Sequence, residues 1–366
     1  MQEIRKLNIT LFIGSLTGGG AERVTCNLAN YLVNRGHHVE ILTMSDVEDT
    51  YKLNRYVKKL PLIKKIERKN KIYDTLLRFI RLYQYMKDNK NVDCYIVMLP
   101  VTITMMLLLK SKTKAKIIAS ERNDPSTYSY IMQKLLKGMA HKADGYVFQT
   151  KEARDWYGET ISLCKTRIIP NAINSEFTFK PYKGEREKKI VATGRLKAQK
   201  NFNLLIKAFA DIKDDFEDYS LIIYGEGEKR KELENLIDSL NLKKCVNMPG
   251  YTTNIKQEIE NASLFVLSSD YEGMPNALME AMALGLPCIS TDCPVGGPQY
   301  LIQNEINGLL VPIQNKEAME EAMKKILSNP KKAKKMGSEA AKISYKLRPD
   351  KIYSQWEAFC LKVVDK

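Results

Sequence analysis

The sequence has no long hydrophobic run and no closely spaced pair of cysteines. Its longest apolar stretch, residues 94–109, is interrupted by Pro100 and two threonines, and it falls short of the roughly 20 residues that a membrane-spanning helix needs. Seven cysteines without a CxxC pair are typical of reduced cytosolic thiols, not of a disulfide framework. The apolar segment 7–16 runs into glycines and not into a small-residue cleavage site, so we expect no signal peptide.

Histidines and metal-binding motifs are also scarce. The three histidines are His37, His38 and His141; the first two begin an expected strand and the last ends an expected helix, so we interpret all three as structural or surface residues. The sequence has no strict D-x-D motif and no Cys/His cluster with zinc-ligand spacing. It also lacks the GxxxxGK[ST] phosphate loop and the GxGxxG dinucleotide fingerprint, which disfavours both of those nucleotide-binding classes.

The composition is that of a soluble globular protein with more than one domain. The chain has 366 residues, of which 44% are hydrophobic and 28% are charged, and domains usually hold about 100–200 residues. Short segments rich in Ile and Val alternate with helical periodicity. The expected strands are residues 7–15, 38–43, 93–98, 116–120, 145–149, 167–169, 189–193, 220–224, 246–248, 264–268, 288–290 and 308–311. The expected helices are residues 22–34, 73–87, 129–141, 151–161, 202–213, 229–239, 255–261, 276–284 and 316–328.

This alternation predicts two successive α/β domains with parallel sheets. The charged, Pro- and Gly-bearing residues 179–187 are the best candidate linker. We therefore expect a first domain over residues 1–180, a second over 181–345, and a C-terminal amphipathic helix within 346–366 that packs back on the first domain.

The positive charge is concentrated in the first half of the chain. Residues 1–180 hold 30 Lys and Arg against 17 Asp and Glu, and residues 52–90 alone hold 13 against 3. Such a segment suggests an anionic partner. Its helix also has an apolar face with Leu76, Phe79, Ile80, Tyr83 and Met86. Such a helix can lie in an anionic membrane interface, or it can simply pack on the sheet; nucleic acid is disfavoured because no nucleic-acid-binding module is recognisable.

Three clusters of residues could bind a phosphorylated ligand. Gly18-Gly19-Gly20 follows an expected strand and opens a helix, where backbone N–H groups and the helix dipole favour an anion. Arg195, preceded by Gly194, and Lys200 follow the strand 189–193, and two cations there suit a diphosphate leaving group. Gly225 and Gly227 end the next strand, where a planar base could approach the backbone.

A fourth cluster contains two carboxylates separated by seven residues. Glu272 lies in the turn after the strand 264–268, and Glu280 lies two turns into the following helix. Both carboxylates could therefore face hydroxyl groups of one ligand.

Together these motifs resemble glycosyltransferase family 4. The resemblance includes Gly18–Gly20 with Ala21-Glu22-Arg23, the Gly194-Arg195 and Lys200-Asn201 pairs, and the Glu–seven–Glu element, and it covers nearly the whole chain. It implies retaining, nucleotide-sugar-dependent enzymes of the GT-B fold, in which two Rossmann-like α/β domains face a central cleft.

The resemblance also implies roles for individual residues. Arg195 and Lys200 should hold the donor diphosphate, Glu280 should bind the nucleotide ribose, and Glu272 should contact the transferred sugar. Gly18, Gly19 and Gly20 should let the first domain close over the β-phosphate. The remaining implied donor-binding residues are Gly194, Gly225, Gly227, Tyr251, Asn254, Gly273, Met274, Pro275 and Asn276.

Two positions depart from the family pattern. Many members have a histidine near the scissile bond, whereas this chain has Ser-Glu-Arg-Asn-Asp-Pro at residues 120–125. Glu121, Arg122 and Asn123 are therefore the candidates for a polar group at the reacting sugar, and we place Glu121 and Asn123 among the catalytic residues. Gln299 stands where relatives often have glutamate, so a charge-dependent role there is disfavoured.

The sequence thus predicts a metal-independent transferase that moves a hexose or N-acetylhexosamine from a nucleoside-diphosphate sugar, expected to be a UDP-sugar. We expect neither a metal ion nor another cofactor, because Arg195 and Lys200 can replace a metal on the diphosphate. The expected acceptor is a polyprenyl-diphosphate-linked glycan or glycolipid at the inner face of the cell membrane. Two alternatives stay open: a GT-B nucleotide-sugar epimerase, and a non-catalytic sugar-nucleotide-binding scaffold.

Overall fold

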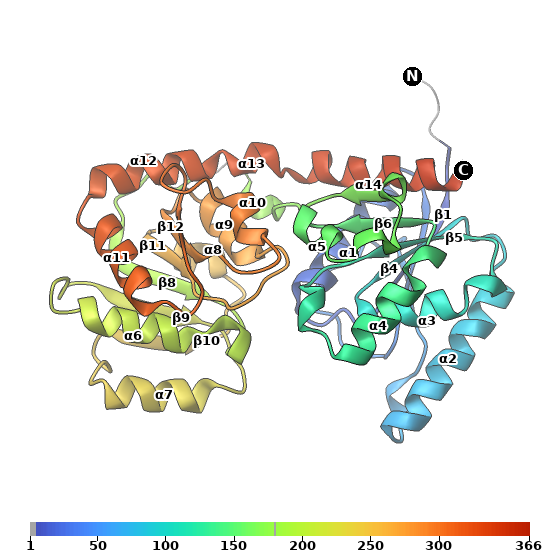
Figure 1. Ribbon diagram of the computed structural model, residues 1–366, viewed down its shortest axis with the longest axis horizontal. Coiled ribbons are helices and arrows are strands. Elements are labelled where there is room, and N and C mark those ends of the chain that lie inside the picture. Colours follow the sequence, from blue (N-terminus) through green and yellow to red (C-terminus); the bar gives the residue numbers. More distant parts are fainter. Residues whose placement is uncertain (1–4, 179–180) are drawn as a thin grey trace. The chain divides into compact units, whose positions relative to one another are not determined.

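The computed structural model describes residues 5–178 and 181–366, which form two units (Figure 1). Unit 1 comprises Met1–Ala172 together with Asp350–Lys366, and unit 2 comprises Ile173–Pro349. None of the helices in the described ranges combines the length and the hydropathy that a membrane span requires.

Unit 1 is built on a seven-stranded sheet in the order β3-β2-β1-β4-β5-β6-β7. All of its strands pair in parallel. Their bounds are β1 Asn8–Ile13, β2 His38–Thr43, β3 Lys58–Pro61, β4 Cys94–Met98, β5 Lys116–Ser120, β6 Gly145–Phe148 and β7 Thr166–Ile168. The order reverses at β1, because β2 lies on one side of it and β4 on the other. In open parallel sheets, ligands bind at the carboxyl ends of the strands beside such a reversal.

The helices of unit 1 connect these parallel strands. They are α1 Gly20–Asn34, α2 Lys71–Asp88, α3 Pro100–Leu108, α4 Tyr130–Met139 and α5 Lys151–Asp155. A further helix, α14 Pro349–Val364, returns from the end of the chain to unit 1. Trp356 of α14 is fully buried, so the helix belongs to the core of this unit.

A buried polar cluster holds α14 against α1 and β1. The Leu7 N–H donates to His37 Nδ1 at 3.1 Å, so His37 Nε2 carries the proton that faces Glu357 Oε1 at 3.1 Å. Arg35 Nε donates to Glu357 Oε2 at 3.1 Å, and Tyr31 donates to the same oxygen at 3.2 Å. His37 is thus a structural residue, as its place at the start of a strand predicts.

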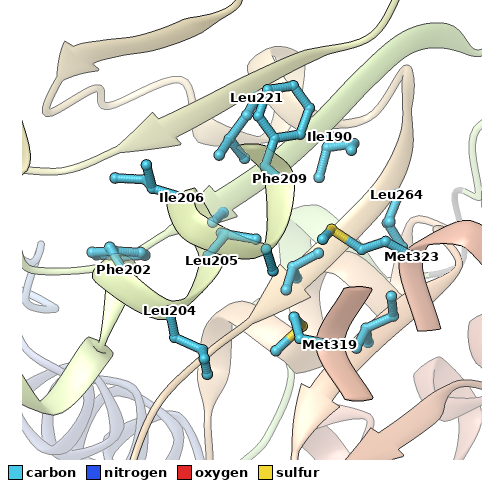
Figure 2. Packing of buried hydrophobic residues seen from close by; sticks show 14 of the residues in the cluster. Ile190, Phe202, Leu204, Leu205, Ile206, Phe209, Leu221, Leu264, Met319 and Met323 are labelled. Atoms are coloured by element: carbon cyan, nitrogen blue, oxygen red, sulfur yellow. The ribbon is translucent and has the colours of Figure 1, made fainter. Parts of the chain in front are cut away.

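Unit 2 repeats the parallel arrangement with six strands in the order β10-β9-β8-β11-β12-β13. The strands are β8 Glu187–Thr193, β9 Ser220–Tyr224, β10 Val246–Gly250, β11 Ala262–Leu267, β12 Cys288–Thr291 and β13 Leu309–Val311. The helices are α6 Phe202–Ile212, α7 Arg230–Ser239, α8 Ile255–Ile259, α9 Asn276–Ala283, α10 Gly297–Leu301, α11 Lys316–Leu327, α12 Pro330–Ala341 and α13 Ile343–Lys346. Figure 2 shows the core of this unit, where Leu205 and Phe209 of α6 lie among sheet residues and Met323 of α11.

The boundary between the units lies earlier than the expected linker. The Ile173 N–H donates to Leu347 O at 3.0 Å, and the Tyr182 N–H donates to Leu284 O at 3.0 Å. Phe177 is buried as well. The described residues from Ile173 onward therefore pack with unit 2, which is why the chain divides after Ala172 and after Pro349 and not at 180 and 345.

Candidate functional site

The carboxyl ends of the strands in unit 2 bring the predicted diphosphate and sugar residues together. Lys200 Nζ lies 2.5 Å from Glu272 Oε1, although the two residues come from the loops after β8 and β11. Ser269 Oγ donates to the same carboxylate oxygen at 2.8 Å. Both side chains of the ion pair are largely buried, with 16% of Lys200 and 11% of Glu272 exposed. The pair is therefore held in place before any ligand arrives.

The loop after β8 is fixed by its own hydrogen bonds. Lys200 ends the short 3-10 helix Ala198–Lys200, and its carbonyl accepts from Ser268 Oγ at 2.8 Å. Asn201 has a φ of 43° and caps α6, and its side chain donates to Asp270 at 2.9 Å. Arg195 lies on the same loop with an exposed side chain. The loop thus presents two cations at one edge of the sheet.

Glu280 lies on α9, which follows the Gly273–Met274–Pro275 turn, and Asn276 is the first residue of that helix. Glu280 is only 7% exposed. Gly273 itself is tightly packed, because a Cβ on Gly297 would lie 1.9 Å from the Gly273 carbonyl oxygen. The turn between the two glutamates is thus held by the glycine-rich loop that opens α10.

The structure gives a different reason for the glycines after β9 from the one that the sequence suggested. A Cβ on Gly225 would lie 1.9 Å from Gly194 O, and one on Gly227 would lie 2.4 Å from Leu196 O. Gly225 also has a φ of 142°. Both glycines are therefore required for the loop after β9 to pack on the loop after β8, whether or not a base binds nearby.

The expected base-pocket residues lie at the end of the neighbouring strand. The Gly225 N–H donates to Gly250 O at 2.8 Å, which joins the ends of β9 and β10. Tyr251 follows β10 and is 69% exposed, and Asn254 precedes α8 and is also exposed. Both residues are therefore at the same edge of the sheet as Lys200 and Glu272.

In unit 1, the glycine loop is held by two residues that the sequence did not single out. The Gly18 N–H donates to Thr50 Oγ1 at 2.9 Å, and Tyr51 OH donates to Gly19 O at 3.1 Å. Gly19 precedes α1 and Gly20 is its first residue. No motif marks Thr50 and Tyr51, because their role depends on a contact between distant segments.

The two catalytic candidates after β5 lie in different environments. Glu121 is only 1% exposed, and burial raises the pKa of its carboxyl group. Asn123, two residues further on, is partly exposed. The residue between them, Arg122, is buried and donates to Asn171 Oδ1 at 3.2 Å.

Metal ligands were not expected from the sequence. In residues 5–178 and 181–366, no group of three or more His, Cys, Asp or Glu side chains is arranged as a metal site. The metal independence of the reaction stays a prediction.

Two family models match the chain, one for each half. The model described as Glycosyltransferase Family 4 matches residues 18–177, and the model described as Glycosyl transferases group 1 matches residues 174–343. Together they match residues 18–343, which include all of the predicted site residues.

Individual proteins are also similar to this chain. A Campylobacter jejuni enzyme, GalNAc-alpha-(1->4)-GalNAc-alpha-(1->3)-diNAcBac-PP-undecaprenol alpha-1,4-N-acetyl-D-galactosaminyltransferase, is 27% identical over 96% of this chain and 97% of its own length. An exopolysaccharide phosphotransferase of Streptomyces coelicolor is 32% identical over 61% of this chain but only 24% of its own length. The crystal structure of S. aureus TarM with fondaparinux, alpha-GlcNAc-glycerol and UDP has a TM-score of 0.80 at 16% identity, covering 97% of this chain and 99% of that one.

The two parallel α/β units and these matches define a GT-B glycosyltransferase. The chain belongs to glycosyltransferase family 4. The family, the fold class and the transferase activity predicted from the sequence are therefore confirmed.

Proposed function

We propose that this enzyme is a retaining, metal-independent transferase that moves a hexose or N-acetylhexosamine from a UDP-sugar to a membrane-associated glycan. The acceptor is a polyprenyl-diphosphate-linked glycan or glycolipid of surface polysaccharide biosynthesis. The observation that carries the proposal is the preformed Lys200–Glu272 pair at the carboxyl edge of the unit 2 sheet, with Arg195 on the same loop as Lys200. The PP-undecaprenol acceptor of the C. jejuni relative and the UDP bound to TarM support the two substrate classes.

The donor site works by electrostatic complementarity. Arg195 and Lys200 stabilise the negative charge that collects on the diphosphate as the glycosidic bond breaks. Glu272 holds Lys200 in place in the free enzyme at 2.5 Å, and its carboxylate contacts hydroxyl groups of the transferred sugar when the donor binds. Glu280 binds the ribose from α9.

A thermal-unfolding screen with a panel of nucleotide sugars tests the donor class. A ligand at 100 times its Kd stabilises the native state by about 2.7 kcal/mol. We expect UDP-sugars to raise the unfolding temperature more than GDP- or ADP-sugars do. Stabilisation by another nucleotide sugar, with none by UDP-sugars, would contradict the proposed donor.

Alanine variants of Glu280 and Glu272 are expected to differ in UDP binding and in turnover. Glu280→Ala removes a ribose contact that exists in the ground state and the transition state alike, so it should mainly weaken UDP binding. Glu272→Ala affects the transferred sugar, so turnover should fall while UDP still binds. Calorimetry with UDP, combined with steady-state kinetics, checks this division. Equal loss of UDP affinity in both variants would contradict it.

Catalysis is expected to persist in excess EDTA, because Arg195 and Lys200 supply the positive charge at the diphosphate. The measurement is the rate of sugar transfer with and without the chelator. A loss of activity that magnesium restores would show that the metal prediction is wrong.

We also propose that α2 and the segment before it bind an anionic membrane surface. Four apolar side chains at spacings of three or four residues are exposed on one face of α2: Ile72 at 83%, Leu76 at 59%, Ile80 at 43% and Tyr83 at 40%. Met86, which the sequence analysis placed on this face, is instead buried with Leu82. The helix therefore packs on unit 1 with one face and leaves another apolar face in solvent.

The cations beside this face divide into two groups. Arg78 donates to Met44 O at 3.0 Å, and Arg81 forms two 2.7 Å hydrogen bonds to Glu67, so both arginines support the fold. Lys65, Lys69 and Lys71 line a hollow at the start of α2, together with Arg68, Arg78 and the acidic Asp74. Their charges are complementary to lipid phosphates, and each cation near an anionic surface contributes about 1 kcal/mol.

Changing Lys65, Lys69 and Lys71 to Gln is therefore expected to weaken binding to anionic liposomes about 100-fold at low salt. Vesicle sedimentation measures this, and binding should also fall as salt rises. The matched control changes three exposed lysines of α12, Lys331, Lys334 and Lys335, to Gln. Equal binding by the two variants would place the surface elsewhere, and no sedimentation of wild type would contradict membrane binding.

A further inference from the structure

The loop after β5 lies at the carboxyl edge of the unit 1 sheet, one strand away from the end of β4. β4 and β5 pair in parallel up to Met98 and Ser120. At the end of β4, Leu99 adopts a φ of 76° and a ψ of 153°, a conformation that is costly for a residue with a Cβ and that gathers at functional sites. The strand order reverses beside β4 at β1. This edge is therefore where a ligand of unit 1 is expected.

Glu121, the first residue of this loop, has both carboxylate oxygens occupied. Oε1 accepts from the N–H groups of Arg122 at 3.0 Å and Asn123 at 3.4 Å, and from Tyr128 OH at 2.6 Å. Oε2 accepts from Tyr157 OH at 3.0 Å. With 1% of the residue exposed, this carboxylate is enclosed by protein groups and does not face solvent. Its hydrogen bonds to the N–H groups of Arg122 and Asn123 hold the backbone of these two residues in place.

The rest of the loop is held as firmly. Asp124 Oδ1 accepts from the backbone N–H and the hydroxyl of Ser126 at 2.8 and 2.7 Å. Gln133 of α4 donates to Ser126 O and Tyr128 O at 2.9 and 2.8 Å. Displacing this loop would cost free energy because the buried Asp124 would lose its partners. The backbone around Asn123 is therefore preorganised.

Asn123 is the exception among residues 121–124, because its neighbours Glu121, Arg122 and Asp124 are all buried while it is partly exposed. Within the part of the chain that the structure describes, no residue makes a hydrogen bond to its carboxamide. An amide offers both donors and an acceptor, which is the pattern that recognises a sugar hydroxyl.

We propose that Asn123 contacts a hydroxyl group of a sugar bound at this edge of unit 1, and that Glu121 is a positioning residue that acts through Asn123 and not as an acid or base. This inference rests on the proposed transferase function. The sequence places both residues among the catalytic candidates. In the structure the Glu121 carboxylate is enclosed, whereas the neutral amide of Asn123 is partly exposed.

Asn123→Ala and Glu121→Gln test the two roles separately. Asn123→Ala should lower kcat about 10- to 100-fold, the effect of losing a contact that strengthens in the transition state, while the unfolding temperature and the affinity for UDP stay at wild-type values. Asn91→Ala, which removes an exposed amide elsewhere in unit 1, is the matched control and should leave kcat unchanged. Unchanged turnover in Asn123→Ala would overturn the contact.

Kinetics also identify which sugar Asn123 touches. If the hydroxyl belongs to the acceptor, Asn123→Ala should raise the acceptor KM and leave the slow hydrolysis of donor without acceptor unchanged. If it belongs to the transferred sugar, donor hydrolysis should fall with transfer.

The pH dependence of kcat separates positioning from acid–base catalysis at Glu121. Glu121→Gln should lower kcat while the shape of the pH profile stays that of wild type, whereas loss of one limb would overturn the positioning role. Tyr128→Phe removes a single 2.6 Å hydrogen bond to Glu121 and should lower kcat by a smaller factor with the same pH profile, which keeps the test valid if Glu121→Gln folds poorly. Wild-type enzyme that transfers no sugar would instead contradict the proposed function.

Discussion

Replacing Lys200 by alanine is expected to lower kcat/KM about 30- to 1,000-fold, which corresponds to the roughly 2–4 kcal/mol that one electrostatic donor contributes to a transition state. The change removes a cation from the diphosphate and also frees Glu272, which then keeps only Ser269 among the hydrogen bonds described above. Both consequences reduce turnover. Steady-state kinetics with saturating acceptor measures the effect.

The matched control for this variant is Lys197→Ala, because Lys197 is an exposed lysine of the same loop. It should retain wild-type kinetics. Arg195→Ala should resemble Lys200→Ala, and Arg195→Lys should also lose activity because a point charge does not replace a bidentate guanidinium. Near-wild-type turnover in both alanine variants would remove the diphosphate assignment.

Replacing Glu357 by alanine is expected to destabilise unit 1 by about 2–3 kcal/mol, because His37 and Tyr31 would lose a buried acceptor. Arg35 is 43% exposed and can turn to water, which limits the loss. Urea unfolding followed by tryptophan fluorescence measures it, since Trp356 lies one residue away and is fully buried.

Two further variants serve as a control and as a conservative replacement. Lys351→Ala, a change at an exposed position of the same helix, should unfold like wild type. Glu357→Gln keeps one acceptor and should lose less stability than alanine. If Glu357→Ala unfolds at the wild-type urea concentration, α14 is not held by this cluster.

Much of the fold could be predicted because the apolar periodicity is clear. The segments 38–43, 116–120 and 220–224 are strands with the bounds expected from the sequence. The edge strand β3 was missed because its sequence, Lys-Lys-Leu-Pro, has little of the apolar character of a central strand. Helix α3 was missed because residues 94–109 are apolar apart from Pro100 and two threonines, and the change from strand to helix at Leu99 leaves no periodic signal.

The candidate site was predicted as a set of residues but not as an arrangement. The motifs placed Lys200 and Glu272 at the ends of different strands, and their direct contact needed the fold. The enclosure of Glu121 could not be foreseen, because it depends on Tyr128 and on Tyr157, which is 36 positions away. The glycines after β9 illustrate the same limit, since the carbonyl groups that exclude a side chain there come from another loop.

The most direct test of the proposed function is transfer of labelled sugar from a UDP-sugar to a polyprenyl-diphosphate-linked glycan. Wild-type enzyme is expected to consume donor and to lengthen the lipid-linked glycan by one sugar with an α linkage, the retained configuration of an α-linked donor. Lys200→Ala should form the same product at least about 30-fold more slowly. Donor consumption without any lengthened glycan, over a panel of lipid-linked acceptors, would contradict the proposed transfer.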